Sequence, residues 1–171
     1  MSILDPNSME YISRSPKQTR RIGMRVGALM QAGDLVCLAG TLGSGKTTFI
    51  QGVASGWGSL DPATSPSFVL VNVYRRFTRD NQSREQRLYH LDAYRLNNAS
   101  EAEELDLEAM LDTAPLVVEW ADRIQSCLPV ERLWVQMRWI DTEQRDMVFS
   151  AAGRRYQEML GAIRRLIFGV T

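Results

Sequence analysis

The sequence predicts an α/β fold with a mixed, mostly parallel central sheet that is flanked by helices and carries a β-hairpin. Short apolar runs alternate with segments of helical periodicity, as in sheets whose faces are covered by helices. A glycine-rich turn at 40–45 joins one apolar run directly to a helical segment. Two β-rich runs, 68–77 and 85–96, are separated by a polar stretch that is typical of a hairpin loop.

The first third of the chain is expected to form a strand, a helix, a second strand and a second helix. Their predicted positions are 9–14, 15–33, 34–39 and 46–53 or slightly beyond. Ser15 can cap the first helix, Pro16 suits its first position, and Gly33 is expected to end it. The Gly, Pro and Ser residues of 56–67 predict a loop.

The rest of the chain shows the same alternation. Ser100 and Glu103 have the spacing of a capping box, which predicts one helix or two short ones after the hairpin. The remaining expected elements are a buried strand, a short helix, two strands and an amphipathic helix, at 115–120, 121–128, 132–140, 145–151 and 154–168. Because 171 residues suffice for one core and are too few for two ordinary ones, residues 1–171 are expected to form a single domain.

The charge and cysteine content exclude several classes of protein. Lys plus Arg and Asp plus Glu are both 20, so no global charge draws the chain to nucleic acid or to a membrane. Cys37 and Cys127 lack the spacing of metal ligands and suggest no disulfide framework. The first ten residues do not resemble a secretory signal, and no apolar run approaches the roughly 18 residues of a spanning helix. We therefore expect a cytoplasmic protein that has no membrane association.

The turn matches the phosphate-loop motif G-x-x-x-x-G-K-[ST]. Its backbone N–H groups can point at phosphate oxygens, and the helix that starts near Lys46 adds its positive end. Lys46 is expected to reach the β- and γ-phosphates, Thr47 to offer its hydroxyl to Mg²⁺, and Thr48 to contact the α-phosphate side. The strand before and the helix after supply the context that the motif needs, so the sequence predicts a P-loop NTPase fold. The predicted nucleotide-binding residues of this segment are Gly40, Leu42, Gly43, Ser44, Gly45, Lys46, Thr47 and Thr48.

Two carboxylates are candidates for holding Mg²⁺ or its waters. Glu119 ends the apolar run 115–120, at the edge of the sheet where ligands bind in open α/β folds. Asp92 lies at the end of the second hairpin run, where alternation places it on one strand face with His90 and Tyr94. A solvated strand face explains Asp92 equally well, and a lone histidine is more often a structural hydrogen-bonding residue. The choice of direct metal ligand stays open.

A hydroxyl in the segment 64–68 is a further candidate. Ser67 of "TSPSF" comes after the loop helix, in the region where phosphate-loop proteins carry a segment that contacts the γ-phosphate or Mg²⁺. An ordinary proline turn explains this segment equally well from its residues alone.

Together these motifs resemble the TsaE (YjeE) family, ATPases of bacterial tRNA threonylcarbamoyladenosine biosynthesis. The matching segments are "GTLGSGKTTF", "TSPSF", "HLDAYRL" followed by "EAEEL", and "VVEW", which occur in the family's order over about 10–150. The resemblance implies a mixed-sheet phosphate-loop domain that binds ATP and Mg²⁺ and hydrolyses ATP slowly alone. It further implies a monomer or weak homo-oligomer that works with the TsaB and TsaD proteins. Those proteins transfer a threonylcarbamoyl group to tRNA, and this chain would drive their turnover and meet tRNA indirectly.

The resemblance also assigns roles to residues. Lys46, Asp92 and Glu119 match the family's catalytic set, with Asp92 as its essential aspartate and Glu119 as its Mg²⁺-linked glutamate. Trp120 matches the tryptophan beside that glutamate. The remaining assignments place three side chains near the nucleotide: Gln18, Thr19 and Arg145.

Two positions depart from the family pattern. Thr41 stands where the family usually has aspartate, so a carboxylate is missing from the phosphate loop. Ser67 stands where the family often has threonine, and it keeps a hydroxyl. If the missing carboxylate helps to hold Mg²⁺ or water, the affinity or the rate of this chain is altered.

Two other functions remain open from the residues. The first is a P-loop small-molecule kinase, for which the arginine-rich segment 75–87 is the candidate lid over the phosphoryl donor. The pattern of this segment is more typical of a hairpin tip. The second is a non-catalytic module that senses nucleotide. The arginines of 75–87 and the acids of 92–112 are either solvated faces or docking patches for tRNA or a partner.

Overall fold

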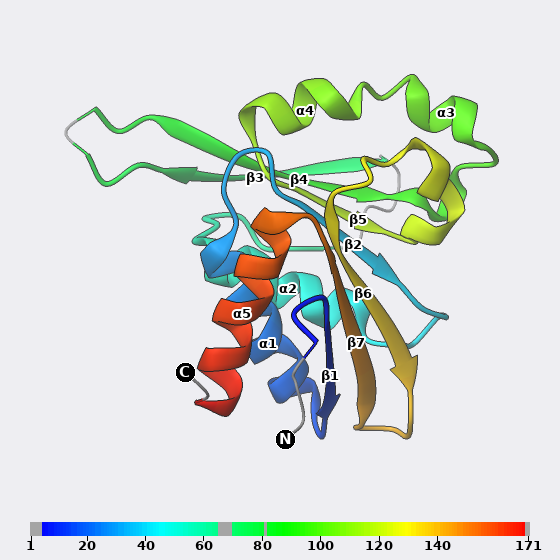
Figure 1. Ribbon diagram of the computed structural model, residues 1–171. Coiled ribbons are helices and arrows are strands. Elements are labelled where there is room, and N and C mark those ends of the chain that lie inside the picture. The colour runs from blue at the N-terminus through cyan, green and yellow to red at the C-terminus, as the bar shows by residue number, and fades with distance from the viewer. Residues whose placement is uncertain (1–4, 65–69, 81, 170–171) are drawn as a thin grey trace.

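The computed structural model describes residues 5–64, 70–80 and 82–169 and contains a seven-stranded sheet of order β1-β7-β6-β2-β5-β4-β3 (Figure 1). The four central strands β6, β2, β5 and β4 pair in parallel, and the pairs at both edges are antiparallel. The predicted mixed sheet is confirmed, with parallel pairing concentrated at its centre. The strands are Ser8–Ser13 (β1), Leu35–Ala39 (β2), Val71–Phe77 (β3), Glu85–Asp92 (β4), Leu116–Glu119 (β5), Arg132–Trp139 (β6) and Arg145–Ala152 (β7).

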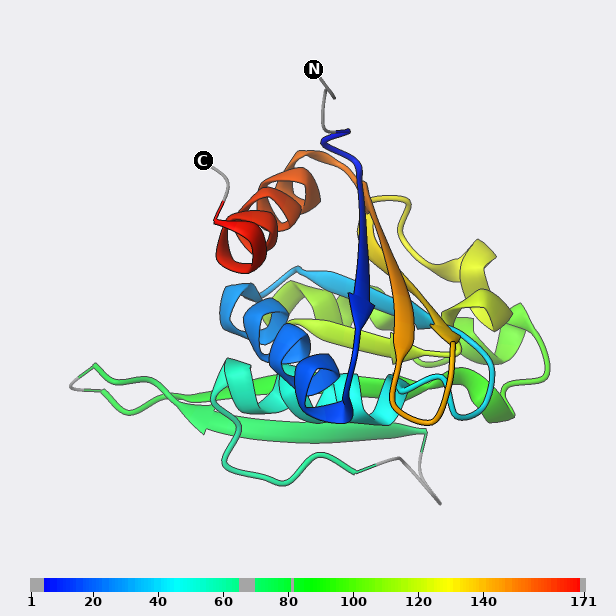
Figure 2. The ribbon, with the colours of Figure 1, turned by 90° about the horizontal axis from the view of Figure 1, so that it is seen from below.

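Helices cover both faces of the sheet, and each face has its own apolar core (Figures 1 and 2). One core packs under α1, α2 and α5, and the other packs under α3, α4 and two 3₁₀ helices, η1 and η2. Within the described ranges, no helix is long and apolar enough to cross a membrane. The bounds are Pro16–Leu29 (α1), Lys46–Trp57 (α2), Ala93–Arg95 (η1), Ala99–Glu103 (α3), Leu107–Thr113 (α4), Ala121–Cys127 (η2) and Arg154–Phe168 (α5).

The hairpin and the last helix form where the sequence predicts them. Strands β3 and β4 pair antiparallel from Val71 opposite Leu91 to Phe77 opposite Glu85, and the hairpin extends beyond the rest of the sheet (Figure 1). Helix α5 spans the predicted range 154–168. The loop predicted to begin at residue 56 begins slightly later, because α2 continues to Trp57 and ends on Gly58 in the left-handed conformation.

Two predicted helix ends are wrong. The capping box of α3 uses Asn98, which accepts from the Glu101 N–H at 3.1 Å, while Glu101 accepts from the Asn97 N–H at 3.0 Å. The cap therefore lies two residues before the predicted Ser100, because Asn98 has the extended backbone and amide oxygen that a cap needs. Helix α1 ends at Leu29, and Gly33, at φ +91°, serves the next turn along the chain.

Helices α1 and α2 touch through their backbones. A Cβ placed on Gly23 or Gly27 of α1 would lie 2.2 or 2.0 Å from a carbonyl oxygen of α2. A Cβ on Gly52 or Gly56 of α2 would lie 2.0 or 1.9 Å from a carbonyl oxygen of α1. This interlocked contact fixes α2, the helix that begins at the phosphate loop, against the core.

Candidate nucleotide site

The turn between β2 and α2 has the backbone that its glycines allow. Gly40, Gly43 and Gly45 all have positive φ, at +152°, +80° and +97°. A Cβ on Gly40 would lie 2.4 Å from the Met137 carbonyl oxygen, so this position has no room for a side chain. Helix α2 begins at Lys46, and its first N–H groups point toward the turn because the N–H groups of an α-helix are directed toward its N-terminus.

The Lys46 ammonium lies inside the turn. Its Nζ donates to the carbonyl oxygens of Gly40 at 2.6 Å and Thr41 at 2.9 Å, and to the Ser44 hydroxyl at 3.2 Å. The residue is 5% exposed. Burial lowers the pKa of this amine, and the charge of Glu119, above those of Asp122 and Asp92, opposes that shift.

Asp92 and Glu119 end neighbouring parallel strands in the same register. Asp92 of β4 pairs with Glu119 of β5, and Glu119 pairs with Leu38 of β2 on its other side. Glu119 therefore lies beside the strand that leads into the phosphate loop, and Asp92 lies one strand further along the same edge of the sheet. They share with the loop a pocket of about 460 Å³, a size typical of ligand sites. The lining residues are Leu42, Gly43, Gly45, Lys46, Thr47, Thr48, Asp92, Tyr94, Glu119, Trp120 and Arg145.

Glu119 is buried and held by His90. The His90 Nε2 lies 2.7 Å from Glu119 Oε2, and the His90 Nδ1 lies 2.8 Å from the Tyr74 hydroxyl. His90 and Glu119 are only 2% and 3% exposed. From the sequence His90 was expected to be a structural hydrogen-bonding residue, and its contact with the candidate metal-linked glutamate was missed. The shared strand face of His90 and Asp92 was the one signal that pointed to it.

Asp92 ends strand β4 and caps the short helix η1. Its Oδ1 accepts from the Tyr94 N–H at 2.9 Å at the start of η1. Tyr94 therefore lies outside the strand, and the predicted alternation of three polar groups along one strand face fails after Asp92. Burial raises the pKa of the Asp92 carboxyl, and the nearby Glu119 charge adds to that shift.

Trp120 forms one wall of the pocket. Its backbone is left-handed at φ +56°, immediately after β5 ends. The Lys46 Nζ lies 4.1 Å from the centroid of its ring, and the Tyr94 ring lies 4.9 Å away. The Arg123 guanidinium stacks on Tyr94 at 4.9 Å. Trp120 thus joins the phosphate loop to the segment after Asp92.

Arg145 approaches the loop from the start of β7. Its Nη1 donates to the carbonyl oxygens of Asp141 and Gln144, at 2.7 and 2.8 Å. Its Nε is buried without a partner among the described residues, and a Cβ on Gly45 would lie 3.5 Å from it. Arg145 also lines a small cavity of about 20 Å³ together with two predicted site residues, Thr19 and Thr48.

Four described residues that the sequence predicted for the site do not line the loop pocket: Gln18, Thr19, Gly40 and Ser44. The Gln18 side chain accepts from the Arg14 N–H at 2.8 Å, at the start of α1. Ser67 lies outside the described residues. No group of three or more His, Cys, Asp or Glu side chains in the described ranges forms a metal site by itself.

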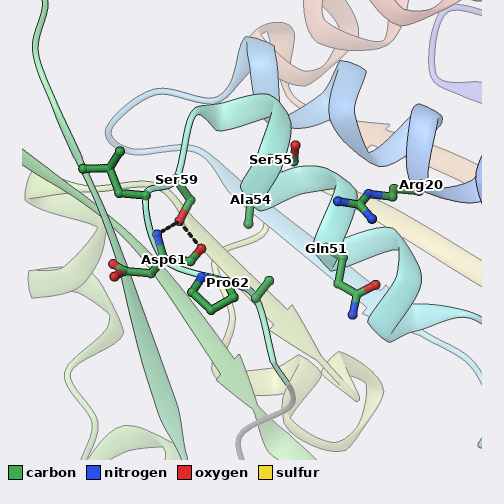
Figure 3. A pocket seen from close by; sticks show the side chains of 9 residues that line it. Arg20, Gln51, Ala54, Ser55, Ser59, Asp61 and Pro62 are labelled. Carbon is green, nitrogen blue, oxygen red and sulfur yellow. Dashed lines mark hydrogen bonds between the residues drawn. The ribbon is translucent and has the colours of Figure 1, made fainter.

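A second pocket lies against α2 and the segment that follows it (Figure 3). It measures about 470 Å³, and its lining includes Arg20, Gln51 and Asp61. None of the predicted nucleotide-binding or catalytic residues line it. We therefore assign the nucleotide site to the loop pocket.

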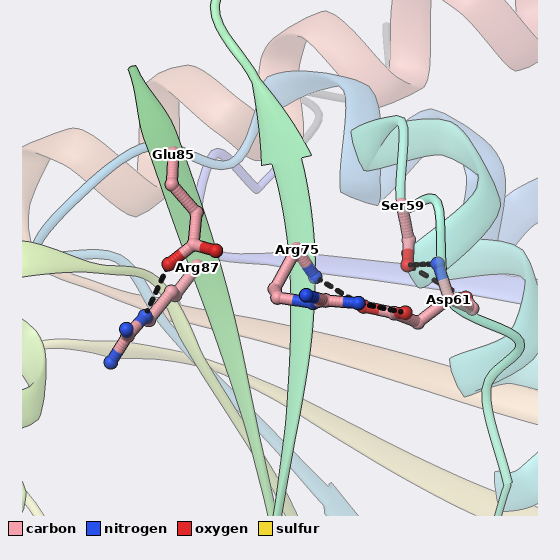
Figure 4. Close-up of polar contacts among 5 residues, drawn as sticks. All are labelled: Ser59, Asp61, Arg75, Glu85 and Arg87. Carbon is pink, nitrogen blue, oxygen red and sulfur yellow. Dashed lines mark hydrogen bonds and ion pairs between the residues drawn. The ribbon is translucent and has the colours of Figure 1, made fainter.

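The arginines of the hairpin do not line the loop pocket, and two of them form ion pairs with acidic side chains (Figure 4). Arg75 pairs with Asp61 at 3.0 Å, and Arg87 pairs with Glu85 at 3.1 Å. Both arginines are more than half exposed, so these ion pairs contribute little to stability.

The chain is similar to several known proteins. A family model described as "Threonylcarbamoyl adenosine biosynthesis protein TsaE" matches residues 13–147. A Bacillus subtilis protein named tRNA threonylcarbamoyladenosine biosynthesis protein TsaE is 34% identical over 92% of this chain and 94% of its own length. A Treponema pallidum protein of the same name is 36% identical over 83% of this chain and 100% of its own. The crystal structure of B. subtilis YdiB superposes with a TM-score of 0.73 at 30% identity, covering 93% of this chain and 95% of that one.

Proposed function

The chain belongs to the TsaE family, and from this premise we propose that it binds and hydrolyses Mg²⁺-ATP in the bacterial tRNA threonylcarbamoyladenosine pathway. The observation that carries the proposal is the meeting of the phosphate loop, Asp92 and Glu119 in one pocket. Each of these groups comes from a different strand end, so the sheet itself assembles the site.

The loop side of the pocket suits the phosphates of ATP. The turn offers backbone N–H groups, the start of α2 offers its positive end, and Lys46 offers a buried ammonium. In our proposal phosphate oxygens take over Lys46 protons that now point at the carbonyl oxygens of Gly40 and Thr41. The Nε of Arg145, which has no partner in the described part of the chain, is a further donor at the same pocket.

The carboxylate side of the pocket suits the metal and the attacking water. Mg²⁺ would neutralise phosphate charge, and its candidate ligands are the Thr47 hydroxyl with Asp92 or Glu119. Glu119 is fixed by His90, whereas Asp92 is bonded through one oxygen to a backbone N–H. We propose that these carboxylates orient the metal and water rather than form a covalent intermediate.

The biological role in this proposal comes from the family. We propose that the chain acts in the cytoplasm with the TsaB and TsaD proteins, drives turnover of their complex and meets tRNA only through it. As for the other members, ATP hydrolysis would be slow without partners.

A small-molecule kinase is the alternative function. A kinase lid would bring arginines over the phosphates, but no arginine of the hairpin lines the loop pocket. Arg75 and Arg87 face Asp61 and Glu85 instead (Figure 4). The geometry favours hydrolysis over transfer to a metabolite.

The phosphate-loop assignment is tested with Lys46→Ala. ATP binding, measured by calorimetry, should be lost because the buried ammonium that meets the phosphates is gone. Lys17→Ala is the matched control, since Lys17 is an exposed lysine outside the pocket and should leave binding unchanged. Wild-type ATP affinity in Lys46→Ala would contradict the assignment.

The role of the carboxylates is tested with Asp92→Ala. This variant should keep ATP binding and lose the hydrolysis that TsaB and TsaD stimulate, because the loop and Lys46 remain intact. Stimulated hydrolysis at the wild-type rate would show that Asp92 has no catalytic role.

A further inference from the structure

We propose that His90 is the positioning residue of the site, which holds the Glu119 carboxylate in one orientation and links it to the backbone carbonyl of Thr64. The inference rests on the proposed function, because Glu119 matters only if the pocket binds Mg²⁺-ATP. It adds a residue that touches neither phosphate nor metal and acts through Glu119 alone.

His90 is buried, and its surroundings fix its ring. It is the only histidine of the chain and is 2% exposed, and both of its ring nitrogens have partners. An ionised carboxylate only accepts hydrogen bonds, so the Nε2 that lies 2.7 Å from Glu119 Oε2 donates to it. In the neutral ring the Nδ1 then accepts from the Tyr74 hydroxyl at 2.8 Å. This pairing fixes both the tautomer and the tilt of the imidazole.

The hydrogen bond from His90 restricts the orientation of the Glu119 carboxylate. Holding Oε2 fixes the plane of the carboxylate and leaves Oε1 as the oxygen for the pocket, which Glu119 lines. Fixing this carboxylate before the ligand arrives avoids the loss of side-chain freedom when it binds. Partners of this kind behind a metal ligand typically change metal affinity or activity by about 10- to 100-fold when they are removed.

The hydrogen bonds of His90 continue through Tyr74 to Thr64, and we call this chain of contacts the relay. The Tyr74 hydroxyl lies 3.2 Å from the Thr64 carbonyl oxygen, and Asn72 Nδ2 donates to the same oxygen at 2.8 Å. Tyr74 has one hydroxyl proton and two acceptors, His90 Nδ1 and the Thr64 carbonyl. A displacement of the Thr64 carbonyl therefore changes the bond that orients His90, and through it Glu119.

A structural role alone would also explain a buried histidine, so the experiment must separate the two. We compare His90→Leu, which removes both ring bonds, with His90→Gln, whose amide can still donate to Glu119. Turnover of Mg²⁺-ATP should fall by about 10- to 100-fold in His90→Leu and recover most of that loss in His90→Gln. ATP binding without metal should stay at the wild-type affinity in both variants. Equal turnover in wild type and His90→Leu would overturn the inference.

A double-mutant cycle with Glu119→Gln tests whether His90 acts through Glu119. Single-turnover measurements with excess protein over hours make slow residual rates visible. If His90 acts only through Glu119, adding His90→Leu to Glu119→Gln should change the rate by less than about twofold. A further loss as large as the one His90→Leu causes alone would show an independent, structural effect and overturn the inference.

The bonds themselves can be observed without any turnover. In untagged protein with ¹⁵N-labelled histidine rings, NMR should show a single set of ring signals, because His90 is the only histidine. Glu119→Gln should shift the Nε2 signal and Tyr74→Phe the Nδ1 signal. Unmoved signals would overturn the relay even if the protein is an active ATPase. A wild-type chain that neither binds nor hydrolyses ATP would instead overturn the proposed function, and with it the catalytic role of His90.

Discussion

The interlocked glycines of α1 and α2 make a sharp prediction about stability. Replacing Gly52 by Ala adds one methyl group on the face of α2 that touches α1. That methyl carbon would lie 2.0 Å from the Arg20 carbonyl oxygen and 3.0 Å from the Met24 nitrogen. Both are backbone atoms, so no side-chain rotation relieves the contact, and the two helices must separate by about 1 Å to reach normal van der Waals spacing.

The change in the free energy of unfolding that Gly52→Ala causes is the balance of two opposing effects. Alanine has a higher helix propensity than glycine by about 0.8–1.0 kcal/mol, which favours the variant. Overpacking a close contact costs about 1–3 kcal/mol and more where the backbone itself is in the way, which favours the wild type. We take the upper end of the cost and expect Gly52→Ala to lower the free energy of unfolding by about 2 kcal/mol. For a chain of this size that lowers Tm by about 4–8 °C.

Gly161→Ala is the matched control. Gly161 also lies within a helix, α5, but the nearest atom to its Cβ is the flexible Arg165 guanidinium at 3.6 Å. Here the propensity effect stands alone, so the free energy of unfolding should rise by about 0.5–1 kcal/mol. Urea unfolding of both variants beside wild type measures the difference. Equal effects in the two variants would refute the interlocked packing of α1 against α2.

Three other predictions each concern a single residue. Tyr156→Phe should lower the free energy of unfolding by about 1–2 kcal/mol in urea, because it leaves the buried Leu35 N–H without the hydroxyl that now lies 2.9 Å away; an unchanged midpoint would contradict this. Burial raises the pKa of the Cys37 thiol to about 12 from 9.0, so only the unfolded chain ionises between these values and stability falls as pH rises above 9. Cys37→Ala should flatten that fall in urea unfolding at alkaline pH, and an identical pH dependence would argue against it. Thr41→Asp introduces a carboxylate into the phosphate loop and should lower the Mg²⁺ concentration for half-maximal ATP hydrolysis, with Thr41→Asn as the neutral control; a change shared by both variants would exclude a charge effect.

The features that the sequence predicts well depend on local physics. The backbone of the turn at 40–45 is one, since Gly40, Gly43 and Gly45 allow its positive φ angles within a few residues. The helix over 154–168 and the hairpin are others, because each has a strong periodicity and clear ends. The α3 cap shows the limit of this reasoning. Two capping boxes overlap around Ser100, and only the backbone conformation of Asn98 selects between them.

The features that the sequence does not reveal depend on register and packing between distant segments. His90 meets Glu119 because β4 and β5 pair with Asp92 opposite Glu119, and no local pattern specifies that register. The contact of α1 with α2 through Gly23 and Gly27, which are four residues apart, is another such feature. That spacing alone cannot identify the partner helix.

We propose that the pocket of Lys46, Asp92 and Glu119 hydrolyses ATP and so drives turnover of the complex of the TsaB and TsaD proteins. The most direct measurement combines the purified chain with these partners, with and without ATP, and monitors both co-purification and phosphate release. We predict association with the partners and ATP hydrolysis that is slow alone and faster in the complex. No association, together with transfer of phosphate to a metabolite, would contradict the claim and support a kinase.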